Sequence, residues 1–400
     1  MMKVSERSKL VKPSVTLALA AKAQAMRAQG VDLVNFTAGE PDFDTPQRIK
    51  DAAVQALKKG MTKYTDVRGI EPLRDAVAKK YLKEFALQYS KDEVLVSCGG
   101  KHALYNIFQA IIDPGDEVII PSPYWVSYSD MVLLAGGVPK LIPTTEENGF
   151  RITPEQLKAA MTSRTRAFVF NSPSNPTGAA YGLEEIQGLC RILQQHNCLI
   201  LSDDIYEKIV YDGFRFHSMV SVSPNLRERT IIFNSLSKTY AMTGWRIGYA
   251  LGPAAIISAA AKIQSQSTSN PTSFAQVAAI EALAGPQDEV QQMVNEFQKR
   301  RDLIVKRLKG MPGIRCFNPQ GAFYVFPNIG SFLGKTINGK KLASASDLAE
   351  YFLQEARVLA VPGEDFGSKE NIRISYATSL EEIEKGCERI EAALKKLLEA

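Results

Sequence analysis

The sequence predicts an α/β protein with a large domain, built on a mainly parallel sheet between helices, and a smaller α+β domain. Short β-branched and aromatic runs alternate with helix-like segments from Val94 to Leu251, as in a parallel sheet covered by helices. From about Gly285 the pattern changes to a long charged helix followed by short strands. We expect an N-terminal arm with part of the small domain over 1–45, the large domain over 46–285 and the small domain over 286–400.

The composition excludes several classes of protein. With 400 residues, 45% hydrophobic and 23% charged, the chain can bury a large core. Its net charge of +5 comes without a dense basic run, so we expect neither nucleic acid nor a membrane as partner. The five cysteines and three histidines are scattered, without disulfide-framework or metal-ligand spacing. The polar N-terminus lacks a signal-peptide core, and no apolar run is long enough to span a membrane, so we expect a cytoplasmic protein without a metal.

The first part of the chain predicts an arm, a helix, a short strand and a turn-rich loop. These segments are 1–14, Thr16–Gln29, Val31–Phe36 and Thr37–Pro46. Gly39 in the loop allows a ligand close to the backbone. Thr45 and Pro46 suit the N-cap and the first residue of the next helix.

The large domain predicts strands that end next to polar residues. Expected strands are Val94–Ser97, Val118–Pro121, Ala167–Asn171, Cys198–Ser202, Thr230–Asn234 and Ile247–Leu251, with helices over Ile70–Phe85 and Leu183–Gln195. Asn175, Asp203, Tyr206 and Lys238 all lie at or just beyond a strand end. Ligands of such sheets sit at the carboxyl ends of the strands, so these four side chains should converge.

Two further segments suit a planar, phosphorylated ligand. Gly99, Gly100 and Lys101 lie between an expected strand and an expected helix, where backbone N–H groups can bind a phosphate. Alone, the Gly99–Gly100 pair more often marks a simple tight turn. The spacing is not that of a Walker loop. Trp125 offers a flat face for stacking or is an ordinary core residue.

The segment from Ser235 to Gly248 combines an amine with phosphate donors. Lys238 follows a buried strand in a mostly uncharged neighbourhood, where a lysine can lose its proton and attack a carbonyl. Ser235, Ser237 and Arg246 can supply hydroxyls and a cation. An aldehyde-binding amine beside phosphate donors is what pyridoxal 5'-phosphate requires. Alone, a Ser-x-x-Lys motif far more often marks a solvated lysine in a polar loop.

The C-terminal part predicts the smaller domain. Its elements are a helix over Asp288–Lys309, Phe323–Pro327, a helix over Ser346–Glu355, Val358–Pro362, a strand over Asn371–Tyr376 and a last helix that starts at the capping box Ser379–Glu382. Without context, Arg373 in the strand is more simply a surface charge.

These segments together resemble the class I, fold-type I pyridoxal-phosphate aminotransferases. The similarity extends from Lys12 to the last helix and is closest to the bacterial aspartate aminotransferases, including aspartate/prephenate aminotransferases. The matching segments are Gly39–Pro46, Tyr64 with Gly69, Gly99–Lys101, Ser122–Trp125, Asn175–Gly178, Asp203–Tyr206, Ser235–Lys238 with Arg246, and Arg373. Their order and spacing make an accidental match very improbable.

The resemblance implies a role for each residue. Lys238 would bond the aldehyde of the cofactor and move the substrate proton, and Asp203 would pair with the pyridine N–H. The remaining contacts would be Tyr206 and Asn175 with the phenolic oxygen, Trp125 with the ring face, and Gly99, Gly100, Lys101, Ser235, Ser237 and Arg246 with the phosphate end. Arg373 would grip the substrate α-carboxylate with Gly39 and Asn175.

The implied assembly is a homodimer with shared active sites, because in this family Tyr64 reaches the phosphate of the neighbouring subunit. The implied reaction moves the amino group of L-aspartate to 2-oxoglutarate, with prephenate as a further acceptor. Lys101 and Lys12 are candidates for the distal acid group of the substrate, or for solvated surface lysines.

Other functions stay open at this point. The same fold serves aminotransferases of aromatic or alanine-type substrates and carbon–sulfur lyases, against which a distal acid-binding lysine argues. A non-enzymatic regulator would need a DNA-binding segment ahead of the first matching motif at Lys12. A dehydrogenase is disfavoured because no GxGxxG follows a strand.

Overall fold

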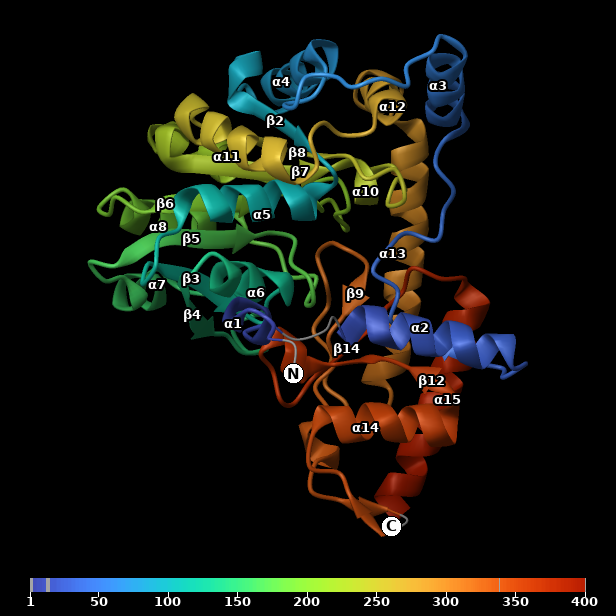
Figure 1. Cartoon of the computed structure of the whole chain (residues 1–400). Coiled ribbons are helices and arrows are strands. Elements are labelled where there is room, and N and C mark those ends of the chain that lie inside the picture. The colour runs from blue at the N-terminus through green and yellow to red at the C-terminus, as the bar shows by residue number, and fades with distance from the viewer. Residues whose placement is uncertain (1–2, 12–14, 338, 400) are drawn as a thin grey trace.

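The computed structural model describes residues 3–11, 15–337 and 339–399. Within them, seven strands form a central sheet in the order β2-β8-β7-β6-β5-β3-β4 (Figure 1). Their bounds are β2 Val94–Ser97, β3 Glu117–Ser122, β4 Val138–Pro143, β5 Thr165–Asn171, β6 Leu199–Asp203, β7 Thr230–Ser235 and β8 Gly248–Leu251. Strand β8 runs antiparallel to both neighbours and the other pairs are parallel, which confirms the expected mainly parallel sheet.

Alternation of apolar side chains explains why helices cover both faces of this sheet. Val169 packs with residues of α5, α6 and α11, whereas Phe168 packs with residues of α7, α8 and α9 on the opposite face. These helices are α5 Gly100–Ile111, α6 Ser127–Leu134, α11 Ala254–Ser267, α7 Pro154–Ala160, α8 Leu183–Leu193 and α9 Met219–Val222. Such continuous apolar runs are typical of strands that are buried on both faces.

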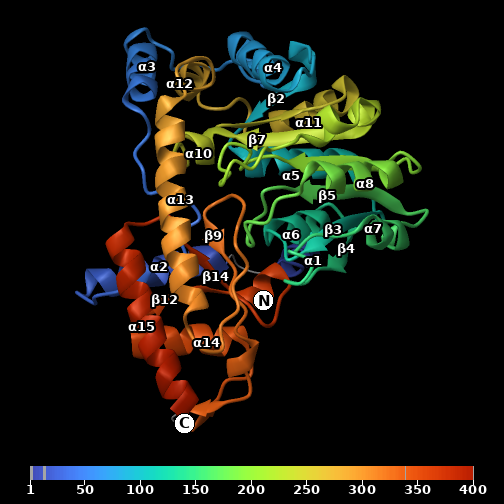
Figure 2. The same cartoon turned by 180° about the vertical axis from the view of Figure 1, so that it is seen from behind.

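Helices α3 (Gln47–Lys58) and α4 (Glu71–Phe85) pack with α12 (Ser273–Ala284) at the β2 end of the sheet (Figures 1 and 2). The short helices are α1 Glu6–Lys9 and α10 Leu236–Thr239, and the 3-10 turns are η1 Lys91–Glu93, η2 Pro224–Arg229, η3 Gly330–Phe332 and η5 Gly363–Phe366. In the part of the chain that the structure describes, no helix combines the length and apolar character that a membrane span needs.

A second, smaller layer contains an antiparallel sheet of order β13-β14-β9 and a parallel pair of β1 with β12. The strands are β9 Tyr324–Val325, β13 Val361–Pro362, β14 Ile372–Ser375, β1 Val34–Asn35 and β12 Val358–Leu359, and a hairpin joins β10 Thr336–Ile337 to β11 Lys340–Lys341. The helices are α2 Val15–Ala28, α13 Asp288–Lys309, α14 Ala345–Tyr351 and α15 Leu380–Glu399.

Helix α13 runs alongside both layers (Figure 2). It begins near α12 at the large sheet and packs against α15 of the smaller layer. The pairing of β1 with β12 brings an N-terminal segment to the C-terminal elements, as expected for part of 1–45. The three predicted domain ranges themselves stay a prediction.

One local prediction was wrong, and two segments show more detail than was predicted. Helix α3 begins at Gln47 with Pro46 as its N-cap, and the Thr45 hydroxyl instead donates to the Ala241 carbonyl oxygen at 2.7 Å. Tertiary pairing therefore overrides the cap that the local sequence suggests. The polar arm contains the short helix α1, and the helix expected up to Glu355 ends as α14 and continues as a π-helix over Phe352–Ala356.

Candidate active site

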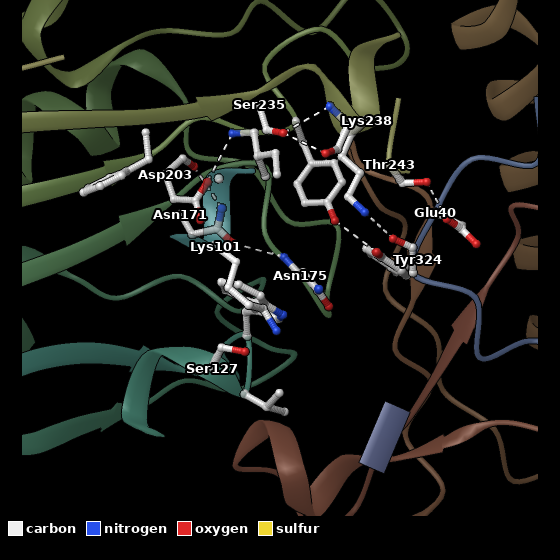
Figure 3. Close-up of a pocket in the computed structure, with 18 of the residues that line it drawn as sticks. Glu40, Lys101, Ser127, Asn171, Asn175, Asp203, Ser235, Lys238, Thr243 and Tyr324 are labelled. Carbon is white, nitrogen blue, oxygen red and sulfur yellow. Dashed lines mark hydrogen bonds between the residues drawn. The ribbon is translucent and has the colours of Figure 1, made fainter. Parts of the chain in front are cut away.

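The candidate site is a cavity of about 480 Å³ at the carboxyl ends of the central strands (Figure 3). Asn171, Asp203 and Phe233 stand in register on β5, β6 and β7 and form its floor. Predicted site residues that line it are Gly39, Gly100, Lys101, Trp125, Asn175, Asp203, Tyr206, Ser235, Ser237, Lys238, Arg246 and Arg373. Together with the smaller layer, which supplies Arg373, this sheet edge brings together residues more than 300 positions apart in the sequence.

Lys238 presents its amine inside this cavity. The strand β7 ends at Ser235, whose hydroxyl caps the short helix α10 by accepting from the Ser237 N–H at 3.1 Å. The Lys238 amine donates to the Gly39 carbonyl oxygen. Burial lowers the pKa of Lys238 to about 8, although the Glu40 carboxylate opposes this shift. An amine that loses its proton near neutral pH is a ready nucleophile and proton carrier.

Asp203 lies at the floor, 8% exposed. Its carboxylate accepts from the Tyr128 hydroxyl at 2.6 Å and from the Ile205 N–H at 3.3 Å. Burial raises the pKa of Asp203 to about 6, although these hydrogen bonds and the charge of Lys238 oppose the shift. A protonated ring nitrogen placed against this carboxylate would supply the close opposite charge that it needs when ionised.

The Gly99–Gly100 turn forms a cradle that has no room for side chains. Helix α5 begins at Gly100, and Gly99 has φ +90°, where a Cβ would clash with the Arg246 guanidinium. A Cβ on Gly100 would come within 3.3 Å of Ser235. Free N–H groups at a helix start, a guanidinium and the hydroxyls of Ser235 and Ser237 are suitable donors for a phosphate.

Arg373 is 2% exposed, so its interpretation as a surface charge is wrong. Its Nη1 donates to Asn175 Oδ1 at 3.1 Å and its Nη2 to the Thr37 carbonyl oxygen at 3.0 Å. Its buried Nε has no hydrogen-bond partner within the described ranges. A guanidinium that is held in place and still has a free donor suits an incoming carboxylate.

Lys101 and Trp125 form another part of the cavity wall. The Lys101 Nζ lies 5.0 Å from the Trp125 ring centre, and the Trp125 ring meets the Tyr128 ring edge-on at 5.3 Å. Burial and the neighbouring Arg246 charge lower the pKa of Lys101. An anion bound here would therefore be attracted by two cations at once.

Two predicted residues that the structure describes do not line the cavity. Gly99 lies beneath it against Arg246, and Tyr64 is 90% exposed in the single chain. Lys12 lies outside the described residues. The roles assigned to all predicted site residues stay predictions.

The sequence reasoning missed several lining residues, namely Glu40, Ser127, Tyr128, Asn171, Thr243 and Tyr324. Tyr128 follows Trp125 by three residues, so a helix starting after Trp125 could have suggested it. Tyr324 belongs to the segment Phe323–Pro327, whose strand character was not predicted, and nothing local indicates that its ring faces the cavity.

The fold, the buried amine of Lys238 and the phosphate cradle together define a pyridoxal-phosphate-dependent transferase. The model of the family "Aminotransferase class I and II" matches residues 31–390, so the chain belongs to this family, whose class I members depend on pyridoxal phosphate. The residues described above fit that cofactor: an acid for the ring nitrogen, a flat indole, a phosphate cradle and an amine.

Three known proteins show how far the similarity extends. The aspartate/prephenate aminotransferase of Cereibacter sphaeroides is 51% identical over 384 residues, which cover 96% of each chain. The crystal structure of the Rhizobium meliloti aspartate aminotransferase has a TM-score of 0.95 at 46% identity, covering 99% of this chain and all of that one. The Thermus thermophilus aspartate aminotransferase with maleate has a TM-score of 0.92 at 44% identity, covering 98% and 100%.

Proposed function

We propose that the protein is an aspartate aminotransferase, which moves the amino group of L-aspartate to 2-oxoglutarate and also accepts prephenate. The observation that carries this is the placement of two cations, Arg373 and Lys101, in the wall of the cavity that contains the Lys238 amine. One cation suits the α-carboxylate and the other a distal acid group. The names of the three similar proteins support this choice of substrate.

Bound pyridoxal phosphate supplies an electron sink for the charge that develops on the substrate α-carbon. Asp203 would hold the proton of the ring nitrogen, and Trp125 would cover one face of the ring. The phosphate would be held by the N–H groups at the start of α5, by Ser235 and Ser237, and by Arg246. These contacts would orient the cofactor in the cavity that contains the Lys238 amine.

The substrate is oriented by its carboxylates. Arg373, held by Asn175 and the Thr37 carbonyl oxygen, binds the α-carboxylate at the Gly39 end of the cavity. The Lys238 amine would take the proton from the substrate α-carbon and serve as the proton carrier of the site, which its lowered pKa favours at neutral pH. Lys101 binds the distal acid group, and Lys12 is proposed as its helper for the bulkier substrate.

The proposed assembly is a homodimer in the cytoplasm. Tyr64 is 90% exposed in the single chain, as is expected for a side chain that acts in the cavity of a partner subunit. Val54 and Leu57 on α3 are also exposed, at 46% and 44%, close to the helix α12 that α3 packs against. An apolar surface of this kind suits contact with a second copy.

The distal role of Lys101 can be tested with substrates that differ in one acid group. A charge-assisted hydrogen bond is worth about 1.5–3 kcal/mol. At about 1.36 kcal/mol per tenfold change, Lys101→Ala should lower kcat/KM for aspartate by roughly 10- to 150-fold. Alanine lacks the distal carboxylate and should be nearly unaffected. Steady-state kinetics with aspartate, alanine and prephenate measure the difference.

Lys395→Ala, on an exposed face of α15, is the matched control and should leave all three substrates unchanged. Lys12→Ala tests the second lysine: a loss with prephenate alone would make it the determinant of the bulkier substrate. Equal losses for alanine and aspartate in Lys101→Ala would refute the distal role. In Lys238→Ala, the visible absorbance that accompanies bonding of the cofactor to the lysine should be absent.

A further inference from the structure

Tyr324 lies where the smaller layer meets the cavity. It is the first residue of β9, pairs with Ser375 of β14, and is 1% exposed. Arg373 is on the same neighbouring strand, β14. The side chain of Tyr324 lines the cavity that the ends of the large sheet form, so it connects the two layers inside the site.

Two contacts define what Tyr324 touches. Its hydroxyl oxygen lies 3.0 Å from the hydroxyl oxygen of Tyr206, and Figure 3 draws this bond in the cavity wall near Lys238. The face of its ring lies beneath the Arg373 guanidinium, 4.6 Å from ring centre to the guanidinium carbon. The hydroxyl of Tyr324 therefore contacts Tyr206, which is proposed to bind the cofactor. Its ring contacts Arg373, which is proposed to bind the substrate carboxylate.

The direction of the hydroxyl bond depends on what else Tyr206 binds. Either hydroxyl can donate in the structure as it stands. A phenol has one proton, so if Tyr206 donates to the cofactor, Tyr324 must be the donor in the pair. Burial raises the pKa of Tyr324, and the Arg373 charge above its ring opposes that rise.

We propose that Tyr324 is a positioning residue with two separable tasks: its hydroxyl donates to Tyr206 and strengthens Tyr206 as a donor to the bound cofactor, while its ring supports Arg373. The inference rests on the proposed function, in which Tyr206 faces the phenolic oxygen of the cofactor. It adds a residue of the smaller layer to a cofactor contact that the large sheet provides.

The first task has a measurable consequence. Hydrogen bonds in a buried chain polarise one another, so a donor to Tyr206 makes Tyr206 a stronger donor in turn. When Tyr206 donates more strongly, it stabilises the negative charge on the phenolic oxygen of the cofactor. The proton shared between this oxygen and the Lys238 nitrogen is then lost at a lower pH. The pH midpoint of the visible absorbance of the holoenzyme is therefore kept low by Tyr324.

The experiment separates hydroxyl from ring. Tyr324→Phe keeps the ring, so the absorbance midpoint of the substrate-free holoenzyme should rise by about 0.3–1 pH unit. The affinity for maleate, an unreactive dicarboxylate, should stay within about twofold, because the aromatic face under Arg373 remains. Tyr324→Leu should shift the midpoint and also weaken maleate binding by roughly 3- to 30-fold.

Tyr376→Phe is the matched control. Its hydroxyl lies 3.3 Å from the Tyr211 hydroxyl in the buried core, and neither residue lines the cavity. Tyr376→Phe thus removes one hydroxyl from a buried tyrosine pair outside the site and should leave midpoint and maleate affinity unchanged. Tyr324→Phe is the deciding variant should Tyr324→Leu not fold.

If the absorbance midpoint of Tyr324→Phe equals that of a wild type that titrates normally, the proposed role of the hydroxyl is refuted. A loss of maleate affinity in Tyr324→Phe as large as in Tyr324→Leu overturns the division between hydroxyl and ring. A shift of equal size in Tyr376→Phe overturns the inference as well, since the effect would then be general. A wild type that takes up no pyridoxal phosphate overturns the proposed function and this inference with it.

Discussion

Lys238 and Asp203 both line the cavity, and burial favours the neutral form of both. The pKa of Lys238 falls to about 8 and that of Asp203 rises to about 6. The charge of Lys238 opposes the shift of Asp203, yet burial dominates at both residues. An aldehyde at Lys238 would react with the neutral amine that burial favours, whereas a ring cation at Asp203 would stabilise the ionised carboxylate against the effect of burial.

Glu40 sets how far the pKa of Lys238 falls. Its carboxylate, which accepts from the Thr243 hydroxyl at 2.5 Å, stabilises the ammonium form and keeps the pKa from falling further. In protein freed of cofactor, Glu40→Gln should therefore lower the midpoint for reaction of the amine below about 8. The rate of uptake of added pyridoxal phosphate as a function of pH measures this midpoint.

Glu296→Gln, on the exposed face of α13, changes the same charge away from the cavity and should leave the midpoint in place. Lys238→Ala gives the baseline, because uptake without bond formation does not depend on this amine. A midpoint that rises or stays in Glu40→Gln would show that the carboxylate does not act on Lys238.

At the scale of elements, the end of β6 sends two neighbouring acids to different surroundings. Successive residues of a strand point to opposite sides, so Asp203 lines the cavity and Asp204 does not. Asp204 is 1% exposed and accepts from the Ser202 hydroxyl at 2.7 Å. Burial raises its pKa well above the ordinary value, and the charges of Glu207 and Asp203 act in the same direction.

This burial predicts a pH dependence of stability. An acid whose folded pKa lies above its unfolded value of 3.8 binds more protons when folded, so the free energy of unfolding falls as pH rises above 3.8. Asp204→Asn has no proton to release there and should lose less stability over the same interval. The Tm of both proteins, measured at several pH values from 4 upward, gives the difference.

Activity should separate the same two acids. Asp204→Asn should keep its turnover, whereas Asp203→Ala should lose about 3–5 kcal/mol of stabilisation, the cost of breaking a buried ion pair with the ring. The control for the stability measurement is Asp75→Asn, because Asp75 is a half-exposed acid on α4 paired with Lys79. Its Tm should change with pH as the Tm of the wild type does. Equal losses of turnover in the two aspartate variants would show that the register of this turn is misassigned.

Elements with a strong local signal were predictable. The long helix α13 was predicted with its observed bounds, Asp288–Lys309, because its period and charges are regular. The strand order and the antiparallel course of β8 were not, since they depend on pairing between distant segments. The same holds in the site: residues at strand ends were found, whereas Tyr324 enters through the packing of β9 against the large sheet.

At the scale of the whole molecule, the single chain leaves one predicted residue outside its own cavity. Tyr64 lies before α4 and is 90% exposed, in contrast to the buried residues of the site. An aromatic side chain so exposed gains little in a monomer. Its proposed place is the phosphate end of a neighbouring cavity, which makes each active site depend on two subunits.

Complementation between inactive subunits tests this sharing. In a mixed dimer of Tyr64→Ala and Lys238→Ala subunits, one cavity combines an intact Lys238 with an intact Tyr64 from its partner, and the other carries both defects. Random exchange of equal amounts makes half of the dimers mixed, so about a quarter of the wild-type activity should return.

Mixing Asp203→Ala with Lys238→Ala is the matched control: both residues belong to the cavity of their own chain, so each mixed dimer has two defective sites and no activity should return. Subunit exchange is verified by two affinity tags before activity is measured. Recovery in neither mixture would mean that Tyr64 acts within its own chain, and recovery in both would mean that Asp203 and Lys238 do not share one site.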